Sequence, residues 1–201
     1  MFMRGEGRRS VAPLPLALGL LVAGVMSEVV PVKAQQFVAP GARATIVSET
    51  NAYRQARGLA PLDESAGASQ VAQAYATYLA RTLKQGHGAD GRSPAQRLRA
   101  GGIKFCKFRG ENWHQSWTRP ARASVESAMA KAMRFWKRSP GHERALRSAS
   151  TEIGVGVAGW KHGNQWYYVS IQMFLDTSCF RGPADALPPL PDRNPERSET
   201  P

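Results

Sequence analysis

Several features that would mark a common enzyme class are missing from this chain of 201 residues. It has only two cysteines, without CxxC spacing, which excludes a zinc ribbon and a thioredoxin-type redox site. No internal repeat is found, and no pair of histidines at i, i+4 spacing forms an HExxH zinc motif. The glycine-rich run 154–159 lies in a strand pattern with no helix after it, so it is not a phosphate-binding loop.

An apolar run near the start of the chain has the setting of a secretory signal. Three arginines precede the apolar run Val11–Met26, and the sequence Val32-Lys33-Ala34 follows it. The run is shorter than the roughly 20 residues of a spanning helix. Residues 1–34 are therefore predicted to be a signal peptide cleaved after Ala34. Its removal would leave a secreted or periplasmic protein without a transmembrane anchor, whereas the alternative is a retained membrane anchor.

Acidic residues are scarce, because 15 Asp and Glu stand against 27 Lys and Arg, for a formal net charge of +12. Such a charge indicates a solvated cationic surface, or affinity for an anionic envelope component, an acidic polymer or nucleic acid. Export argues against nucleic acid, and no arginine-rich helix with interleaved aromatic residues indicates a groove reader. Anionic cell-envelope components or lipid are therefore the expected partners.

The two cysteines, Cys106 and Cys179, are the candidates for a covalent link. Disulfides form and persist in exported proteins. An even pair in such a chain favours one disulfide, Cys106–Cys179, over two buried thiols.

The pattern of apolar residues predicts an α+β fold. Helical spacing with capping residues predicts long helices over 42–57, 66–84 and 120–138 and a short one over 94–100. A short strand is expected within 103–113, followed by a polar connection, and a terminal hairpin over 152–159 and 165–174 with one buried face. Gly154 and Gly156 are expected to mark a close approach by another element. Residues 35–41 are expected to be an extended lead-in, and the proline-rich tail 181–201 to be disordered.

Several short motifs occur in an order that resembles a known family. The chain resembles the CAP superfamily of cysteine-rich secretory proteins, antigen five and pathogenesis-related proteins, in its bacterial SCP-domain branch. The resemblance covers residues 42–174, within an expected domain over 42–180, and implies a three-layer α-β-α sandwich with a small antiparallel sheet between helices. The motifs are Asn51-x-x-Arg54, Gly58–Leu62, His87, Arg97-Leu98, Gly110-Glu111-Asn112, the run Trp136–His142, and Ile153–Gly156.

The same resemblance implies a central cavity lined by two histidines and two acids, which in some members holds zinc or another divalent cation. The histidines correspond to His87 and His142, and the first acid to Glu111. At the position of the second acid this chain has Ser139. His114 is expected to have an exposed or packing role.

The trio of His87, Glu111 and His142 leaves several functions open. Two imidazoles and a carboxylate are a known zinc ligand set, and a bound metal could activate water. Without a metal, one imidazole could act as a general base oriented by Glu111. The trio could also simply pair buried polar groups and stabilise the fold. We expect a binding module for a small ligand, lipid or divalent metal rather than an enzyme, the alternative being a metal- or His-dependent, peptidase-like extracytoplasmic hydrolase.

Overall fold

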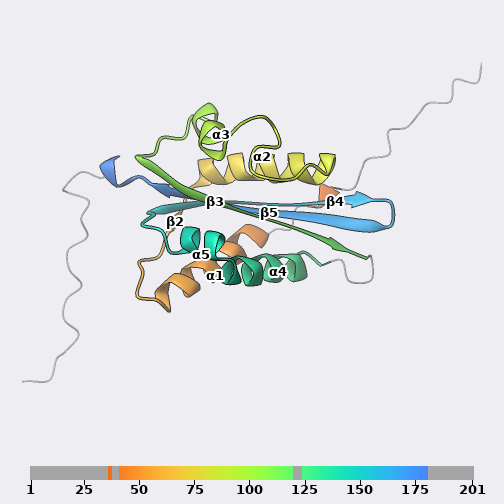
Figure 1. The fold of residues 1–201 in the computed structure, drawn as a ribbon, viewed down its shortest axis with the longest axis horizontal. Coiled ribbons are helices and arrows are strands. Elements are labelled where there is room, and N and C mark those ends of the chain that lie inside the picture. The colour runs from red at the N-terminus through yellow and green to blue at the C-terminus, as the bar shows by residue number, and fades with distance from the viewer. Residues whose placement is uncertain (1–35, 38–40, 120–123, 181–201) are drawn as a thin grey trace, which may run out of the picture. The chain divides into compact units, whose positions relative to one another are not determined.

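The computed structural model describes residues 36–37, 41–119 and 124–180 (Figure 1). The predicted signal peptide 1–34 and the predicted disordered tail 181–201 lie outside the described residues. What is described belongs to a single unit within Ala34–Pro201. None of the described helices combines the length and the apolar character that crossing a bilayer requires.

Helices cover both faces of a sheet, in the three-layer α-β-α arrangement predicted from the sequence (Figure 1). Within the described residues the strands lie in the order β1-β4-β5-β3, and short β2 adds a parallel pair to β4, so the sheet is mixed rather than purely antiparallel. Helices α2 and α3 lie on one face, and α1, α4 and α5 on the other. In chain order the elements are β1 (Gln36–Phe37), α1 (Ala42–Gln55), β2 (Asp63–Glu64), α2 (Ala66–Thr82), α3 (Pro94–Ala100), β3 (Lys107–Thr118), α4 (Val125–Arg138), α5 (Pro140–Leu146), β4 (Glu152–His162), β5 (Gln165–Asp176) and the 3-10 turn η2 (Ser178–Phe180).

The sheet is larger than the sequence pattern indicated. β4 and β5 form the predicted hairpin around a two-residue turn at 163–164. β3 pairs antiparallel with β5 as far as Thr118, so residues predicted to be a polar connection belong to the strand. The prediction of one exposed hairpin face is wrong: β5 is buried from Tyr167 to Asp176, because helices cover both faces.

Helix α4 begins at Val125, whereas the pattern placed its start at Pro120, which lies outside the described residues. Ser124 caps it, because its hydroxyl accepts the Ser127 amide at 3.0 Å. Phe135 was expected in the buried stripe of this helix, yet its side chain is 47% exposed. It therefore belongs to the surface, beside the candidate site described below.

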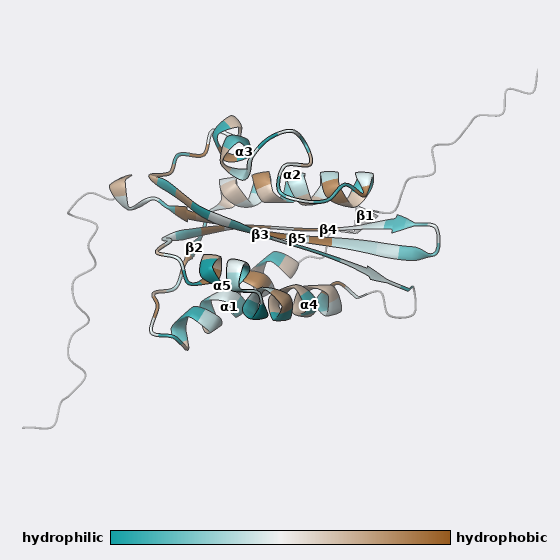
Figure 2. Ribbon diagram, viewed as in Figure 1, coloured by the Kyte–Doolittle hydropathy of each residue, from teal (hydrophilic) through white to brown (hydrophobic). Residues whose placement is uncertain are grey.

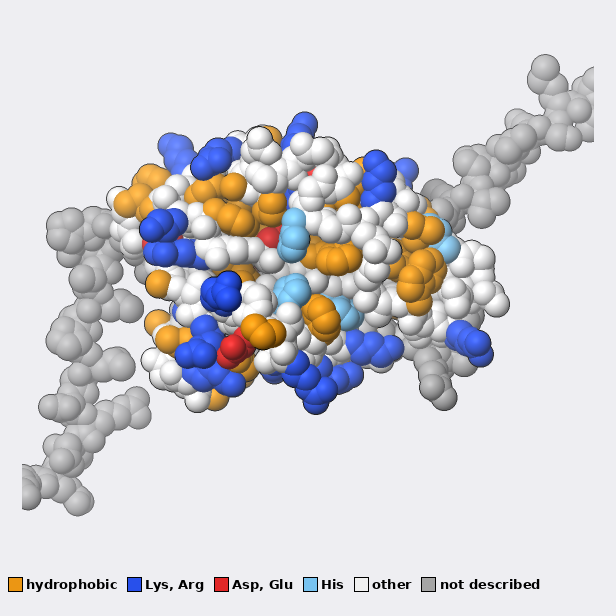
Figure 3. Space-filling view, viewed as in Figure 1, with side chains coloured by type: hydrophobic (Ala, Val, Ile, Leu, Met, Phe, Trp, Pro, Cys, Tyr) orange, Lys and Arg blue, Asp and Glu red, His pale blue; other side chains and the backbone are white. Residues whose placement is uncertain are grey.

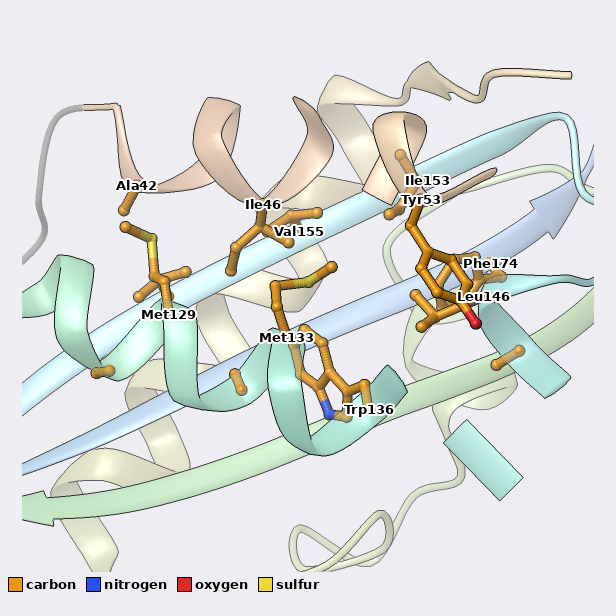
Figure 4. Packing of buried hydrophobic residues seen from close by; sticks show 14 of the residues in the cluster. Ala42, Ile46, Tyr53, Met129, Met133, Trp136, Leu146, Ile153, Val155 and Phe174 are labelled. Carbon is orange, nitrogen blue, oxygen red and sulfur yellow. The ribbon is translucent and has the colours of Figure 1, made fainter. Parts of the chain in front are cut away.

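Two apolar cores fill the two interfaces of the sandwich. The core between the sheet and α1, α4 and α5 contains Ile46, Met133, Trp136 and Val155, whose side chains converge in Figure 4. The other core joins the alanine-rich α2 to β5. Figure 2 shows the apolar residues gathered along the middle of the sheet, while teal residues mark the outer parts of the helices. Burial of these two faces is the main favourable term in folding.

The glycines of β4 allow α2 to lie directly on the strand, as predicted. A Cβ built on Gly154 would lie 2.6 Å from Ala68 backbone, and one on Gly156 would lie 2.3 Å from the backbone of Ala72. This close approach lets α2 side chains bond the strand: the Val155 amide donates to the Ser69 hydroxyl at 3.0 Å. Any side chain at either glycine would push the two backbones apart.

The predicted disulfide is present, with Cys106 and Cys179 joined and their Cα atoms 5.9 Å apart. The bond links the residue before β3 to the 3-10 turn after β5. Beside it, the Cys106 amide donates to the Asp176 carbonyl at 2.8 Å. The start of β3 is therefore held to the end of β5 both covalently and by a hydrogen bond.

Candidate functional site

The candidate site is built around Glu111 on the edge strand β3. Successive side chains of a strand face opposite sides, so Glu111 faces α3 while Asn112 faces α5. The Glu111 side chain is only 1% exposed, and its Oε1 lies 2.7 Å from Nδ1 of His87, which comes from the loop between α2 and α3. The His87 side chain is 49% exposed. The structure therefore brings two of the three predicted residues into direct contact.

A buried arginine, Arg97 of α3, completes this group. Its Nη2 donates to Oε2 of Glu111 at 2.9 Å, and the Arg97 side chain is 5% exposed. Nη1 donates to the Asp90 carboxylate at 2.9 Å and to the His87 carbonyl at 2.9 Å. Arg97 therefore fixes the carboxylate and the backbone of the histidine together. The motif Arg97-Leu98 was a family signal in the sequence, but nothing local to it indicated this contact.

Tyr75 of α2 holds the histidine loop from behind. The Arg97 guanidinium stacks 3.4 Å from the centre of its ring. The Tyr75 hydroxyl donates to the Gly86 carbonyl and accepts the Ala89 amide. Burial raises the pKa of this hydroxyl. Gly86 and Ala89, which lie on either side of His87 in the chain, are therefore hydrogen-bonded to the same tyrosine hydroxyl. These bonds position the loop that carries the imidazole.

His142 lies on the other face of β3, near the start of α5. Its Nδ1 is 2.8 Å from the hydroxyl of Ser139, which stands where the resemblance led us to expect a second acid. Its carbonyl accepts from Asn112 Nδ2 at 3.2 Å, and Asn112 in turn donates to Gln172. Desolvation, and then the charge of His87, lower the pKa of His142. His142 is therefore placed precisely, but with a hydroxyl partner instead of a carboxylate.

Aromatic side chains connect the histidines along the surface. His87 packs edge-on against Trp113 at 6.4 Å between ring centres, and Phe135 lies 5.1 Å from His142. His114 lies 5.3 Å from Phe135, so it borders the site, although the sequence indicated no part for it. Desolvation first, then His142 and Lys131, lower the pKa of His114 to about 4. Figure 3 shows histidines and hydrophobic side chains across the middle of this face, with lysines and arginines around them.

The observed contacts do not suit a metal ion at the predicted trio. Both oxygens of Glu111 are engaged by Arg97, and Oε1 also contacts His87 Nδ1. A guanidinium at 2.9 Å repels a cation that would bind the same carboxylate. Across the described parts of the chain, no group of three His, Cys, Asp or Glu side chains could hold a metal ion. In this arrangement, His87 and Glu111 form a hydrogen-bonded group with Arg97, and His142 forms a separate one with Ser139 and Asn112.

A pocket of about 360 Å³ adjoins the same arginine. Its wall combines apolar and aromatic side chains of α2 with the charged groups of Asp90, Arg92 and Arg97. Nε of Arg97 is buried and has no hydrogen-bond partner among the residues that the structure describes. An unpaired donor in a buried group is costly unless an acceptor reaches it. Arg97 is thus shared between the His87–Glu111 group and this pocket.

Comparison with known proteins agrees with the fold. The sequence profile of the cysteine-rich secretory protein family matches residues 47–174. An outer surface protein from Borrelia burgdorferi is similar in structure, with a TM-score of 0.52 at 19% identity over 71% of this chain and 99% of that chain. No curated protein matches the sequence.

Two longer bacterial proteins also contain a similar domain. An extracellular SCP-domain protein from Bacillus anthracis gives a TM-score of 0.49 at 19% identity over 67% of this chain. A cysteine-rich secretory protein from Staphylococcus aureus gives 0.41 at 20% identity over 67% of this chain. This chain spans only 40% and 38% of those two proteins, respectively.

Proposed function

This chain belongs to the cysteine-rich secretory protein family, and we propose that it is an exported binding module that holds a small amphipathic ligand, such as a lipid, at the cell envelope. The signal-like start of the sequence and the Cys106–Cys179 disulfide support an oxidising, extracytoplasmic setting. The high net charge supports association with an anionic envelope.

The observation that carries the proposal is the double role of Arg97. Its guanidinium is paired with Glu111 and Asp90, its buried Nε has no acceptor among the described residues, and Arg97 also lines the pocket. The pocket wall is apolar and aromatic beside that donor, with Tyr75 and Tyr78 stacked at 6.2 Å between ring centres. A small apolar chain with one acceptor oxygen matches this combination of surfaces.

The burial of Glu111 favours binding over catalysis. A carboxylate that is 1% exposed is an unsuitable nucleophile when an arginine engages both of its oxygens, because neither oxygen is free to attack a substrate. Glu111 is hydrogen-bonded to Nδ1 of His87, so the imidazole would contact a ligand through Nε2. Neither His87 nor His142 lines the pocket beside Arg97, and we propose that both belong to the surface around it.

Blocking the pocket tests the proposal directly. Ala74 is an exposed residue of α2 that lines the pocket, and Gln70 is an exposed residue one turn earlier that does not. Fluorescence titration with a fluorescent fatty acid is expected to show binding by the wild type and by Gln70→Trp, and at least tenfold weaker binding by Ala74→Trp. Equal binding by all three proteins would contradict the pocket assignment.

A second candidate, a His-dependent hydrolase, is favoured by the His87–Glu111 contact. A carboxylate that orients an imidazole is the arrangement of a general base and its orienting group. Turnover of peptide or ester substrates by the wild type, lost in His87→Ala, would establish this activity. Under our proposal, both proteins show the same background rate. Zinc calorimetry on wild type, His87→Ala and His142→Ala tests the metal-dependent form, and micromolar binding lost in both variants would support it.

A further inference from the structure

A second pocket, on the other side of α5, is lined by three arginines. It has a volume of about 520 Å³ and lies between β3, which contributes Arg109, and the α5 end, which contributes Arg144 and Arg147. Glu143 is the acidic residue in its wall. It shares no lining residue with the pocket beside Arg97, so the two pockets are separate sites.

A bulge in β3 places Arg109 at this pocket. The pairing of β3 with β5 shifts register between Phe108 and Gly110. Gly110 has φ of 151°, and a Cβ there would lie 3.1 Å from the Cβ of Ala145 in α5. A bulge re-aims neighbouring side chains. Here it brings the edge strand against α5 and sets Arg109 beside the arginines that follow.

The positive charge at the pocket is only partly compensated. Arg109 pairs with Asp176 at 2.5 Å, and Arg147 approaches Glu143 at 3.5 Å, while Glu143 also accepts the Tyr53 hydroxyl. Hydrogen bonds from Ser178 and Arg109 lower the pKa of Asp176 to about 2. Nε of Arg109 is buried and has no acceptor within the described parts of the chain. One of the lining arginines therefore keeps an unused donor.

A fourth, buried arginine lies next to the wall of this pocket and adds to its positive charge. Arg54 of α1 is 3% exposed, and its guanidinium donates to the carbonyls of Ala60, Leu146 and Ser148. Ser148 belongs to the pocket wall. With Arg54 and the three lining arginines set against Glu143 and Asp176, the neighbourhood keeps two positive charges in excess. Charges that are shielded from water act over longer distances than exposed ones.

From this geometry we infer that the pocket of Arg109, Arg144 and Arg147 is a binding site for a phosphoryl group. Arginine presents paired N–H donors that match the oxygens of phosphate. The excess charge attracts a dianion, and the volume admits a phosphate ester with part of its alcohol. The phosphoryl group could belong to an envelope phospholipid or to a soluble phosphate, and the two sources share the same recognition chemistry.

Charge-matched variants of the purified protein test the site. Arg144→Gln/Arg147→Gln removes two exposed guanidinium groups of the pocket, and Lys131→Gln/Arg134→Gln removes two exposed charges from α4. Binding is measured by calorimetry with inorganic phosphate and by sedimentation with vesicles of phosphatidylglycerol or phosphatidylcholine. The pocket variant is expected to lose about tenfold or more in affinity for phosphate or for phosphatidylglycerol vesicles, and the α4 variant less than twofold.

The two probes separate the sources of the phosphoryl group. Binding of phosphate alone assigns a soluble ligand, and pocket-dependent binding of phosphatidylglycerol vesicles assigns a headgroup. Equal losses in the two variants would show non-specific attraction and overturn the inference, as would a wild type that binds neither probe. The inference stands apart from the fatty-acid site, because Ala74→Trp is expected to leave phosphate binding unchanged.

Discussion

Replacing Arg97 by methionine tests whether the buried ion pair organises the candidate site. Methionine keeps an unbranched apolar side chain of similar reach but removes the guanidinium. Glu111, which is 1% exposed, would then keep only His87 as a partner, and the carbonyls of His87 and Arg92 would lose a donor. Removing one partner of a buried pair costs about 3–5 kcal/mol, because the other charge stays buried without compensation. We expect a loss of that size in the free energy of unfolding.

Urea unfolding followed by tryptophan fluorescence measures this loss. Arg99→Met on the same helix is the matched control, because Arg99 is exposed and lies 5.2 Å from the Phe105 ring without an ion pair among the contacts described. Its expected cost is below about 1 kcal/mol. Domains are stabilised by roughly 5–15 kcal/mol, so the two outcomes are easily distinguished.

A double-mutant cycle then assigns the loss to the pair. Glu111→Gln and the double variant Arg97→Met/Glu111→Gln are measured in the same way. Arg97→Met leaves the Glu111 carboxylate buried without its arginine, and Glu111→Gln removes that carboxylate. The loss of stability in the double variant should therefore be smaller than the sum of the two single losses, by about 1–3 kcal/mol. A cost below about 1 kcal/mol for Arg97→Met, or strict additivity, would refute the reasoning.

Three further predictions concern the rest of the domain. Gly156→Ala forces a methyl group against the backbone of α2, so it should cost about 1–3 kcal/mol in unfolding, whereas Gly141→Ala, with open space around it, should be nearly neutral. Reduction of Cys106–Cys179, 73 residues apart, should cost about 4 kcal/mol by loop entropy, and two free thiols in the denatured, unreduced protein would contradict the bond. His114 has a pKa of about 4 when folded and near 6.5 when unfolded, so stability should fall by up to about 3 kcal/mol as the pH drops from 6.5 to 4; a slope unchanged in His114→Gln would exclude it as the cause.

Much of the fold could be predicted because local patterns and tertiary structure agree. Glycines at 154 and 156 weaken an isolated strand, so their presence predicted a close approach by another element. Helix α2 makes this approach. The pair Cys106 and Cys179 left one disulfide possible, and that bond is present. In each case the residue type restricts the alternatives, which is the condition for reading structure from a single sequence.

Other features depend on contacts that sequence spacing does not encode. β3 extends to Thr118 because β5 pairs with it along its whole length, and the polar residues there carry no strand signal of their own. Phe135 fits the buried spacing of α4, yet it packs beside His142 at the surface. Arg97 contacts Glu111, 14 residues away in the chain, because the fold packs α3 against β3. The sequence indicated His87 and Glu111 as site residues, but it did not indicate that Arg97 bonds both of them.

The serine at position 139 decides how the two histidines differ. His87 is bonded to a carboxylate that Arg97 neutralises, whereas His142 is bonded to a neutral hydroxyl. An acid at 139 would favour the charged form of His142, but in this chain desolvation and the charge of His87 lower its pKa. At neutral pH His142 is therefore an uncharged hydrogen-bonding group beside Phe135. A neutral imidazole can donate or accept a hydrogen bond, and the exposed ring of Phe135 beside it offers an apolar contact. These two features suit an uncharged or amphipathic ligand, which agrees with the proposed binding surface.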